Sequence, residues 1–157
     1  RRQRQMCIRD RVKGQKGVLS VEKKLFVETN NGTNRQIRPV TPEQPLRIGD
    51  KVIVRLTIRT DREMNYVFLK DLRAGCFEPA DQLSGPESRD GIWYYRSPKD
   101  VSENFFINRL PEGTFVLEYP VYVSRSGEYA GGISTIQCMY APEFVSHTAG
   151  ESLRIMP

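Results

Sequence analysis

Residues 103–144 have the sequence ENFFINRLPEGTFVLEYPVYVSRSGEYAGGISTIQCMYAPEF, and this stretch decides the fold class. From Phe115 to Val123, aromatic and aliphatic residues recur at every second position, which is the period of a strand with one buried face. Segments 110–113 (LPEG) and 124–127 (SRSG) flank this strand with turn chemistry, because proline presets φ and glycine accepts positive φ. We predict antiparallel strands, with residues 129–140 returning as the hairpin partner. Pro120 lacks the N–H that a ladder needs, so we expect an edge or a bulge there.

The end of this stretch, Met139-Tyr140-Ala141-Pro142, is hard to explain as plain strand. Pro142 favours extended backbone at Ala141, which places a flexible thioether and an amphipathic ring at the end of a strand. Apolar residues at strand ends usually pack, so Met139 and Tyr140 could cap the core. They could instead be presented outward to a partner, and the residues alone leave both interpretations open.

The length and composition favour a single all-β domain. A chain of 157 residues is long enough to bury a core without metals or disulfides, and 12 Gly and 10 Pro punctuate short apolar runs. We predict a linker or irregular first strand over 1–16 and one β-sandwich domain over 17–157. The chain begins with Arg and has no signal peptide or long apolar run, so we interpret it as a fragment of a larger multidomain protein.

The charge and the reactive side chains exclude several function classes. The net charge is +5, but the excess of positive charge lies in the first sixteen residues and no nucleic-acid recognition signature is present, so we do not expect nucleic-acid binding.

The cysteines are widely spaced, at Cys7, Cys76 and Cys138, and we expect reduced, mostly buried thiols and no metal site. A catalytic dyad of Cys138 with His147 is disfavoured, because antiparallel geometry does not bring the two together. We predict no enzyme activity and no cofactor.

Several further elements follow along the chain. The Asn-Gly pair in 30–33 predicts a tight hairpin, and residues 47–59 and 64–72 have strand patterns, whereas 74–91 is predicted to be a long loop. Residues 92–96 hold the densest aromatic cluster, Trp93, Tyr94 and Tyr95. We expect Trp93 to anchor the core and a tyrosine to reach the rim, although three adjacent rings could instead stack a sugar.

Several motifs together resemble a known family. They are LPxGxF at 110–115, IQxMYAPEF at 136–144 and a terminal GxxLxI at 150–155, supported upstream by RIGDKV at 47–52, YVFLKDLRA at 66–74 and YYR at 94–96. This pattern is similar to the last domain of bacterial alpha-2-macroglobulins, which are periplasmic proteins that trap proteases. The resemblance covers most of the chain. It implies an antiparallel two-sheet sandwich of immunoglobulin-like, macroglobulin type, which we expect to have eight or nine short strands.

The resemblance also implies a function. In that family the C-terminal, receptor-binding-like domain packs on a helical domain with a Cys-x-x-Gln thioester, and a Met-Tyr pair shields the reactive bond from water. Met139 and Tyr140 match this pair, while the thioester motif itself is not in this chain. The implied partners are neighbouring domains of the same chain and, through the parent protein, proteases in the periplasm. A lipid anchor on the parent would be the link to a membrane. The alternative is a carbohydrate-binding or adhesive sandwich that uses Trp93, Tyr94 and Tyr95.

Overall fold

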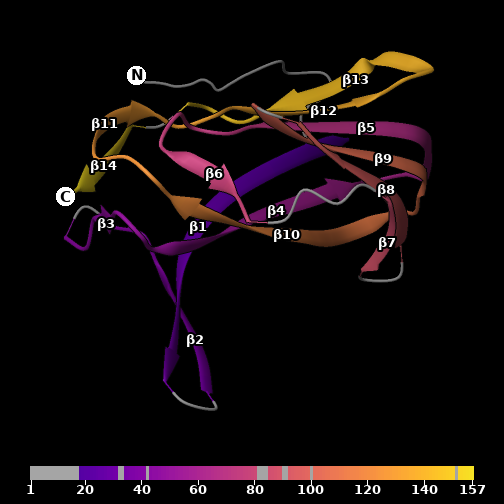
Figure 1. The fold of residues 1–157 in the computed structure, drawn as a ribbon. Coiled ribbons are helices and arrows are strands. Elements are labelled where there is room, and N and C mark those ends of the chain that lie inside the picture. The colour runs from indigo at the N-terminus through magenta and orange to yellow at the C-terminus, as the bar shows by residue number, and fades with distance from the viewer. Residues whose placement is uncertain are drawn as a thin grey trace.

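A computed structural model of the chain describes residues 18–31, 34–41, 43–80, 85–89, 92–99, 101–150 and 152–157. These residues form fourteen strands and no helix, in two large sheets that pack face to face and a small third sheet (Figure 1). The predicted all-β sandwich is confirmed, although the expected eight or nine strands were too few. The predicted linker at 1–16, with Cys7, lies outside the described residues.

The five-stranded sheet is antiparallel, with the order β2-β1-β4-β10-β6. Its strands are β1 (Leu19–Asn31), β2 (Asn34–Pro39), β4 (Lys51–Thr60), β10 (Gly113–Val123) and β6 (Phe77–Pro79). The alternation predicted for β4 and β10 is confirmed, because their apolar positions are buried between the sheets: Val52, Val54, Leu56, Ile58, Leu117, Tyr119 and Val121.

The six-stranded sheet has the order β13-β12-β5-β9-β8-β7. Its strands are β13 (Ala141–His147), β12 (Ser134–Cys138), β5 (Met64–Leu72), β9 (Ser102–Leu110), β8 (Ile92–Pro98) and β7 (Gly85–Arg89). The small sheet consists of β11 (Gly127–Ala130), β14 (Ser152–Met156) and β3 (Leu46–Arg47), with β3 parallel to β14.

Two expectations about connections were wrong. Residues 129–140 do not return along β10: β11 pairs with β14, and β12 crosses to the other sheet, where it lies between β5 and β13. The stretch 74–91 is not one long loop, since β6 and β7 lie within it. Both strands are short and carry few apolar residues, so they show little of the two-residue period by which strands are recognised.

The expectation for Pro120 is confirmed. In the described part of the chain β6 pairs only with Val121 to Val123, so Pro120 lies just beyond that ladder and its missing N–H is not needed there. On the other side of β10, Pro120 lies opposite Ile53 of β4.

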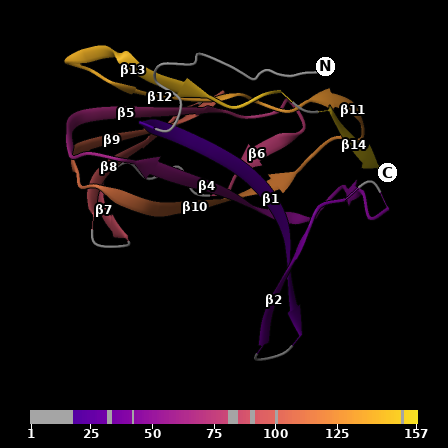
Figure 2. The same cartoon turned by 180° about the vertical axis from the view of Figure 1, so that it is seen from behind.

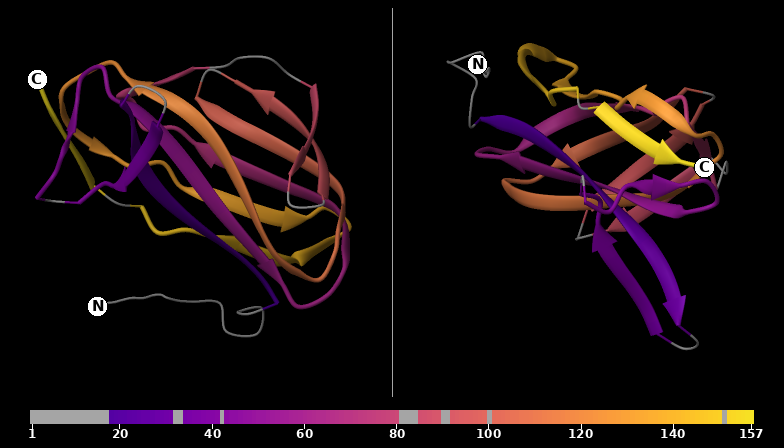
Figure 3. Two further views of the ribbon diagram at one scale, coloured as in Figure 1. Left: turned by 90° about the horizontal axis from the view of Figure 1, so that it is seen from below. Right: turned by 90° about the vertical axis from the view of Figure 1, so that its left-hand side faces the viewer.

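The hairpin of β1 and β2 projects out of the sandwich as an arm, as Figure 2 and Figure 3 show from behind and from the side. Its register runs from Phe26 opposite Pro39 to Asn31 opposite Asn34, which confirms the predicted hairpin. The turn residues 32 and 33 lie outside the described residues. Cys76 and Cys138 are buried free thiols, as predicted for those two. Across the described ranges no helix is long and apolar enough to cross a membrane.

Candidate functional site

Met139 and Tyr140 form the turn between β12 and β13 and are exposed. Met139 is 53% and Tyr140 79% exposed, so neither side chain caps the core. The pairing register shifts between Gln137 and Cys138, just before the turn. Such a bulge bends a strand and redirects the side chains that follow it. We call Met139 and Tyr140 the tip.

Tyr66 of β5 holds the tip in place. The Met139 N–H donates to the Tyr66 carbonyl oxygen at 2.8 Å, and the Tyr66 and Tyr140 rings meet edge to face with centroids 4.9 Å apart. Tyr66 has φ of 60°, the left-handed region that costs a bulky residue roughly 1–2 kcal/mol. Backbone strain of this kind persists only where surrounding contacts determine it, and it clusters at functional sites.

The three aromatic residues of β8 do not form one surface. Tyr94 is buried and meets the ring of Phe105 at 5.6 Å, whereas Trp93 is 70% and Tyr95 48% exposed. The expectation that Trp93 anchors the core was wrong, because successive strand residues point to opposite faces and the core takes Tyr94. A sugar platform built from all three rings is therefore not formed.

The outer face of the six-stranded sheet carries further rings that sequence analysis did not single out. Tyr95 lies opposite Phe106 of β9, and Phe106 lies opposite Phe68 of β5. The Phe68 and Phe106 rings stack with centroids 4.8 Å apart, and Phe106 is 45% exposed. The alternation of strand residues could have predicted the exposure of Phe106, since Phe105 and Ile107 face inward and Phe106 lies between them.

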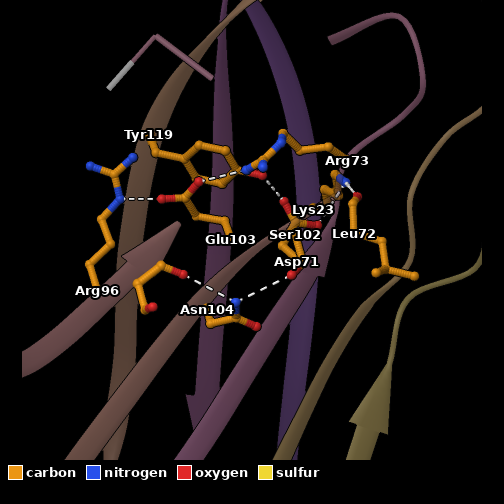
Figure 4. Close-up of polar contacts among 10 residues, drawn as sticks. Lys23, Asp71, Leu72, Arg73, Arg96, Ser102, Glu103, Asn104 and Tyr119 are labelled. Atoms are coloured by element: carbon orange, nitrogen blue, oxygen red, sulfur yellow. Dashed lines mark hydrogen bonds and ion pairs between the residues drawn. The ribbon is translucent and has the colours of Figure 1, made fainter. Parts of the chain in front are cut away.

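The inner face of the same sheet holds a buried ionic cluster (Figure 4). Asp71 of β5 is fully buried and accepts hydrogen bonds from two residues of the opposite sheet: Lys23 Nζ of β1, at 2.7 Å, and the hydroxyl of Tyr119 of β10. The Ser134 hydroxyl donates to the same carboxylate at 2.7 Å. Asp71 therefore joins the two sheets through charged and polar contacts.

Glu103 of β9 is the second buried carboxylate of this ionic cluster. Arg73 Nη1 donates to it at 2.9 Å, and Arg96 Nε of β8 donates to its other oxygen. Figure 4 shows the two guanidinium groups on opposite sides of the carboxylate. Arg73 Nε and Nη2 are buried and have no hydrogen-bond partner among the described residues. Within the same described part of the chain, Lys23, Arg73 and Arg96 contact the carboxylates of Asp71 and Glu103.

Burial shifts the pKa of two groups of the cluster, Glu103 and Tyr119. Desolvation raises the pKa of the Glu103 carboxyl above its ordinary value, while the hydrogen bond and charge of Arg96 and the charge of Arg73 act in the opposite direction. The pKa of Tyr119 is raised well above its ordinary value, first by burial and then by the negative charge of Asp71. Tyr119 therefore stays a neutral hydrogen-bond donor. The sequence did not reveal this cluster, because an isolated Asp or Arg in a strand pattern usually marks the exposed face.

The ionic cluster and the exposed rings share the same strands. Asp71 lies on β5 with Phe68, Glu103 lies on β9 with Phe106, and Arg96 lies on β8 with Trp93 and Tyr95. The contacts of the ionic cluster therefore hold in place the strands that carry the exposed rings. They also hold β5, whose Tyr66 contacts the tip.

A comparison with protein-family models identifies the family. Residues 19–143 match the model described as the bacterial alpha-2-macroglobulin MG10 domain. The chain belongs to this family. The match covers most of the chain, and includes the tip and every residue of the ionic cluster.

Two solved structures share this fold at low sequence identity, and one further protein matches in sequence. The structure superposes on Salmonella alpha-2-macroglobulin reacted with methylamine with a TM-score of 0.68 at 22% identity, and covers 89% of this chain and 9% of that one. For trypsin-activated alpha-2-macroglobulin from Escherichia coli the TM-score is 0.67 at 17% identity, with 89% and 10% covered. Circularly permutated Ras protein 2 of Dictyostelium discoideum is 28% identical over 109 residues, which are 69% of this chain and 3% of that protein. The MG10 domain thus spans a tenth or less of these relatives.

The reactive groups of this MG10 domain are kept apart. His147 lies opposite Thr135, and Cys138 lies opposite Ala141, so the histidine and the thiol are separated by about three residues of strand, roughly 10 Å. Cys138 Sγ instead contacts the Asn65 carbonyl oxygen at 3.4 Å. Burial raises the pKa of the Cys76 thiol, which keeps it protonated and weakly nucleophilic. In the part of the chain that the structure describes, no group of three His, Cys, Asp or Glu residues could hold a metal ion.

Proposed function

We propose that this MG10 domain is the C-terminal, non-catalytic interaction domain of a protease-trapping protein of the alpha-2-macroglobulin type. In this proposal the tip packs on a neighbouring thioester-type domain of the same chain and shields its reactive bond from water. An acyl bond that must survive until a protease arrives needs water to be excluded, and a thioether and an aromatic ring are suited to that task.

The exposed tip is the observation that carries the proposal. Exposing Met139 and Tyr140 forgoes the free energy of burying them, and here a strained tyrosine and a backbone hydrogen bond hold them in that position. A turn held by such contacts also loses less conformational entropy on binding than a loop without them would lose. Both properties fit a surface built for a partner.

The wider setting belongs to the same proposal. Solved structures with this fold belong to chains about ten times longer than this one, which supports a multidomain parent. We place the parent in the bacterial periplasm, where a lipid could anchor it to a membrane and where the proteins that it traps would be proteases. The parent sequence should contain further β-domains and a Cys-x-x-Gln motif before residue 1.

The proposal is tested by thioester lifetime in the full-length parent. Replacing Met139 and Tyr140 together by Ala should accelerate the loss of methylamine-reactive thioester several-fold, since water reaches the bond. Tyr122→Ala is the matched control, because Tyr122 is 44% exposed on the five-stranded sheet, away from the tip. Equal decay in the parent, the double variant and the control would show that the tip does not shield the bond.

A further inference from the structure

We infer that the outer face of the six-stranded sheet is a second docking surface for the domain that covers the tip. We define the aromatic face as the side chains of Phe68, Trp93, Tyr95 and Phe106. This inference rests on the proposed function, and it adds residues to the interface that the tip alone does not supply.

The aromatic face is continuous across neighbouring strands. Tyr95, Phe106 and Phe68 lie directly opposite one another in β8, β9 and β5, and Gln137 of β12 follows in the same row. Trp93 lies two residues before Tyr95 and so points to the same side. At about 4.8 Å between strands, the row from β8 to β12 is roughly 14 Å long. Tyr66 and Tyr140 link it to the tip through their ring contact.

The exposure of these rings is unusual for a domain that works alone. Trp93 is 70%, Tyr95 48% and Phe106 45% exposed, and all three lie on one sheet face. Single exposed apolar residues are ordinary, but a contiguous group of large rings marks an interaction surface. Aromatic residues are also the residues most enriched at the centres of protein interfaces.

Interface size explains why the tip needs this additional surface. Contacts between domains of one chain typically bury about 600–1,500 Å², and two side chains supply only a small part of that area. A partner that covers Met139 and Tyr140 must therefore rest on more of this domain. The row of exposed rings, roughly 14 Å long, ends at β12, the strand that leads into the tip, so both fit inside one such interface.

The chemistry of the face favours a protein partner over a sugar. Phe68 and Phe106 occupy the centre of the row, and neither has a polar group. Groups that can form hydrogen bonds surround this centre, in Tyr95, Gln137 and exposed Lys70. An apolar centre with a polar rim is the usual anatomy of a protein interface.

Hydroxyl-radical footprinting of the uncleaved full-length parent tests the inference through three tyrosines. Tyr95 reports on the aromatic face, Tyr140 on the tip and Tyr122 on the opposite sheet. Each rate is compared with that of the same residue in the urea-unfolded parent. We expect Tyr95 to be protected at least about fivefold more than Tyr122, since rings at the centre of an interface are fully buried.

The outcomes separate this inference from the proposed function. If Tyr140 is protected but Tyr95 is no more protected than Tyr122, the inference is overturned and the shielding tip remains intact. Protection of Tyr95 without Tyr140 would support the aromatic face and contradict the shielding tip. If neither Tyr95 nor Tyr140 is protected, the inference and the proposed function are both overturned. If Tyr95 is protected only after a polysaccharide mixture is added, the aromatic face binds sugars and the inference is overturned.

A second measurement identifies the occupant. A photo-crosslinking amino acid at position 93 of the full-length parent should join this domain to the thioester-type domain of the same chain. The same substitution at position 122 is the control and should not give that product. Crosslinking at position 93 between two copies of the parent, or to no neighbouring domain, would overturn the assignment.

Discussion

The two faces of the six-stranded sheet each depart from the usual distribution of residues, in opposite ways. The inner face buries Asp71, Glu103 and Arg96 together with apolar side chains, whereas the outer face exposes Trp93 and Tyr95. Charged groups are ordinarily outside and large rings inside. Burying charge costs free energy unless it is paired, and exposing rings forgoes the gain from their burial. The inner contacts of Asp71 join the two sheets, whereas in our proposal the outer face serves a partner.

The largest effect expected from this comparison concerns Asp71. Asp71→Ala removes the acceptor of the buried Tyr119 hydroxyl and the carboxylate partner of the Lys23 ammonium, which keeps only the carbonyl oxygens of Leu72 and Gly132. Removing one partner of a buried ion pair costs about 3–5 kcal/mol. We expect urea unfolding to show a loss of that size. Glu63→Ala is the control, because it breaks the exposed Glu63–Arg109 pair and should leave stability almost unchanged. Similar small losses in both variants would mean that Asp71 does not join the sheets.

The protonation of Tyr119 predicts a dependence on alkaline pH. The folded pKa of Tyr119 is raised, so the stability that its protonated hydroxyl contributes is complete below the unfolded value of about 10 and is lost as the pH rises through the folded value. The free energy of unfolding should fall by up to about 1.4 kcal/mol per pH unit above about pH 10 from this group. Urea midpoints of the wild type and of Tyr119→Phe measure it. A slope that is equally steep in Tyr119→Phe would contradict the assignment.

A smaller effect is expected at Tyr66. At φ of 60° an alanine is strained and a glycine is not, so Tyr66→Ala should be about 1 kcal/mol less stable than Tyr66→Gly. Both variants lack the ring, so the difference isolates the backbone. Denaturant unfolding of the pair provides the value. In ordinary strands the glycine variant is the less stable one. If Tyr66→Gly is less stable than Tyr66→Ala, the left-handed conformation is not adopted.

The smallest effect is expected on the outer face. Trp93→Ser and Tyr95→Ser should each change the free energy of unfolding of the domain by no more than about 0.5 kcal/mol, as exposed substitutions usually do. Chemical denaturation of the two variants gives the answer. A loss of several kcal/mol in either would place these rings in the core of this domain and remove the contrast between the faces.

Local patterns predicted the parts of the fold that depend on neighbouring residues. The limits of β5, the alternation of β4 and β10 and the hairpin of β1 with β2 follow from periods and turn residues. The pairing of β12 with β5 did not follow, because it joins segments more than sixty residues apart and no local signal specifies it. The motif around Met139 and Tyr140 pointed to the tip, whose exposure the structure then showed.

Side-chain environment was harder to predict than strand position. Asp71 and Arg96 have the appearance of exposed residues in a strand, and their burial depends on partners from four other segments of the chain. Trp93 and Tyr94 are both large aromatic residues, so their residue types do not show which of them enters the core. The register of β8 against β9 decides it. Contacts of this kind are set by the whole fold.

A structure of the uncleaved parent protein tests the assignment of the outer face most directly. The side chains of Met139, Tyr140 and Trp93 should all lie within van der Waals contact of one neighbouring domain, with the thioester beneath the tip. Solvent around all three side chains, with the neighbouring domain packed on the five-stranded sheet instead, would contradict it.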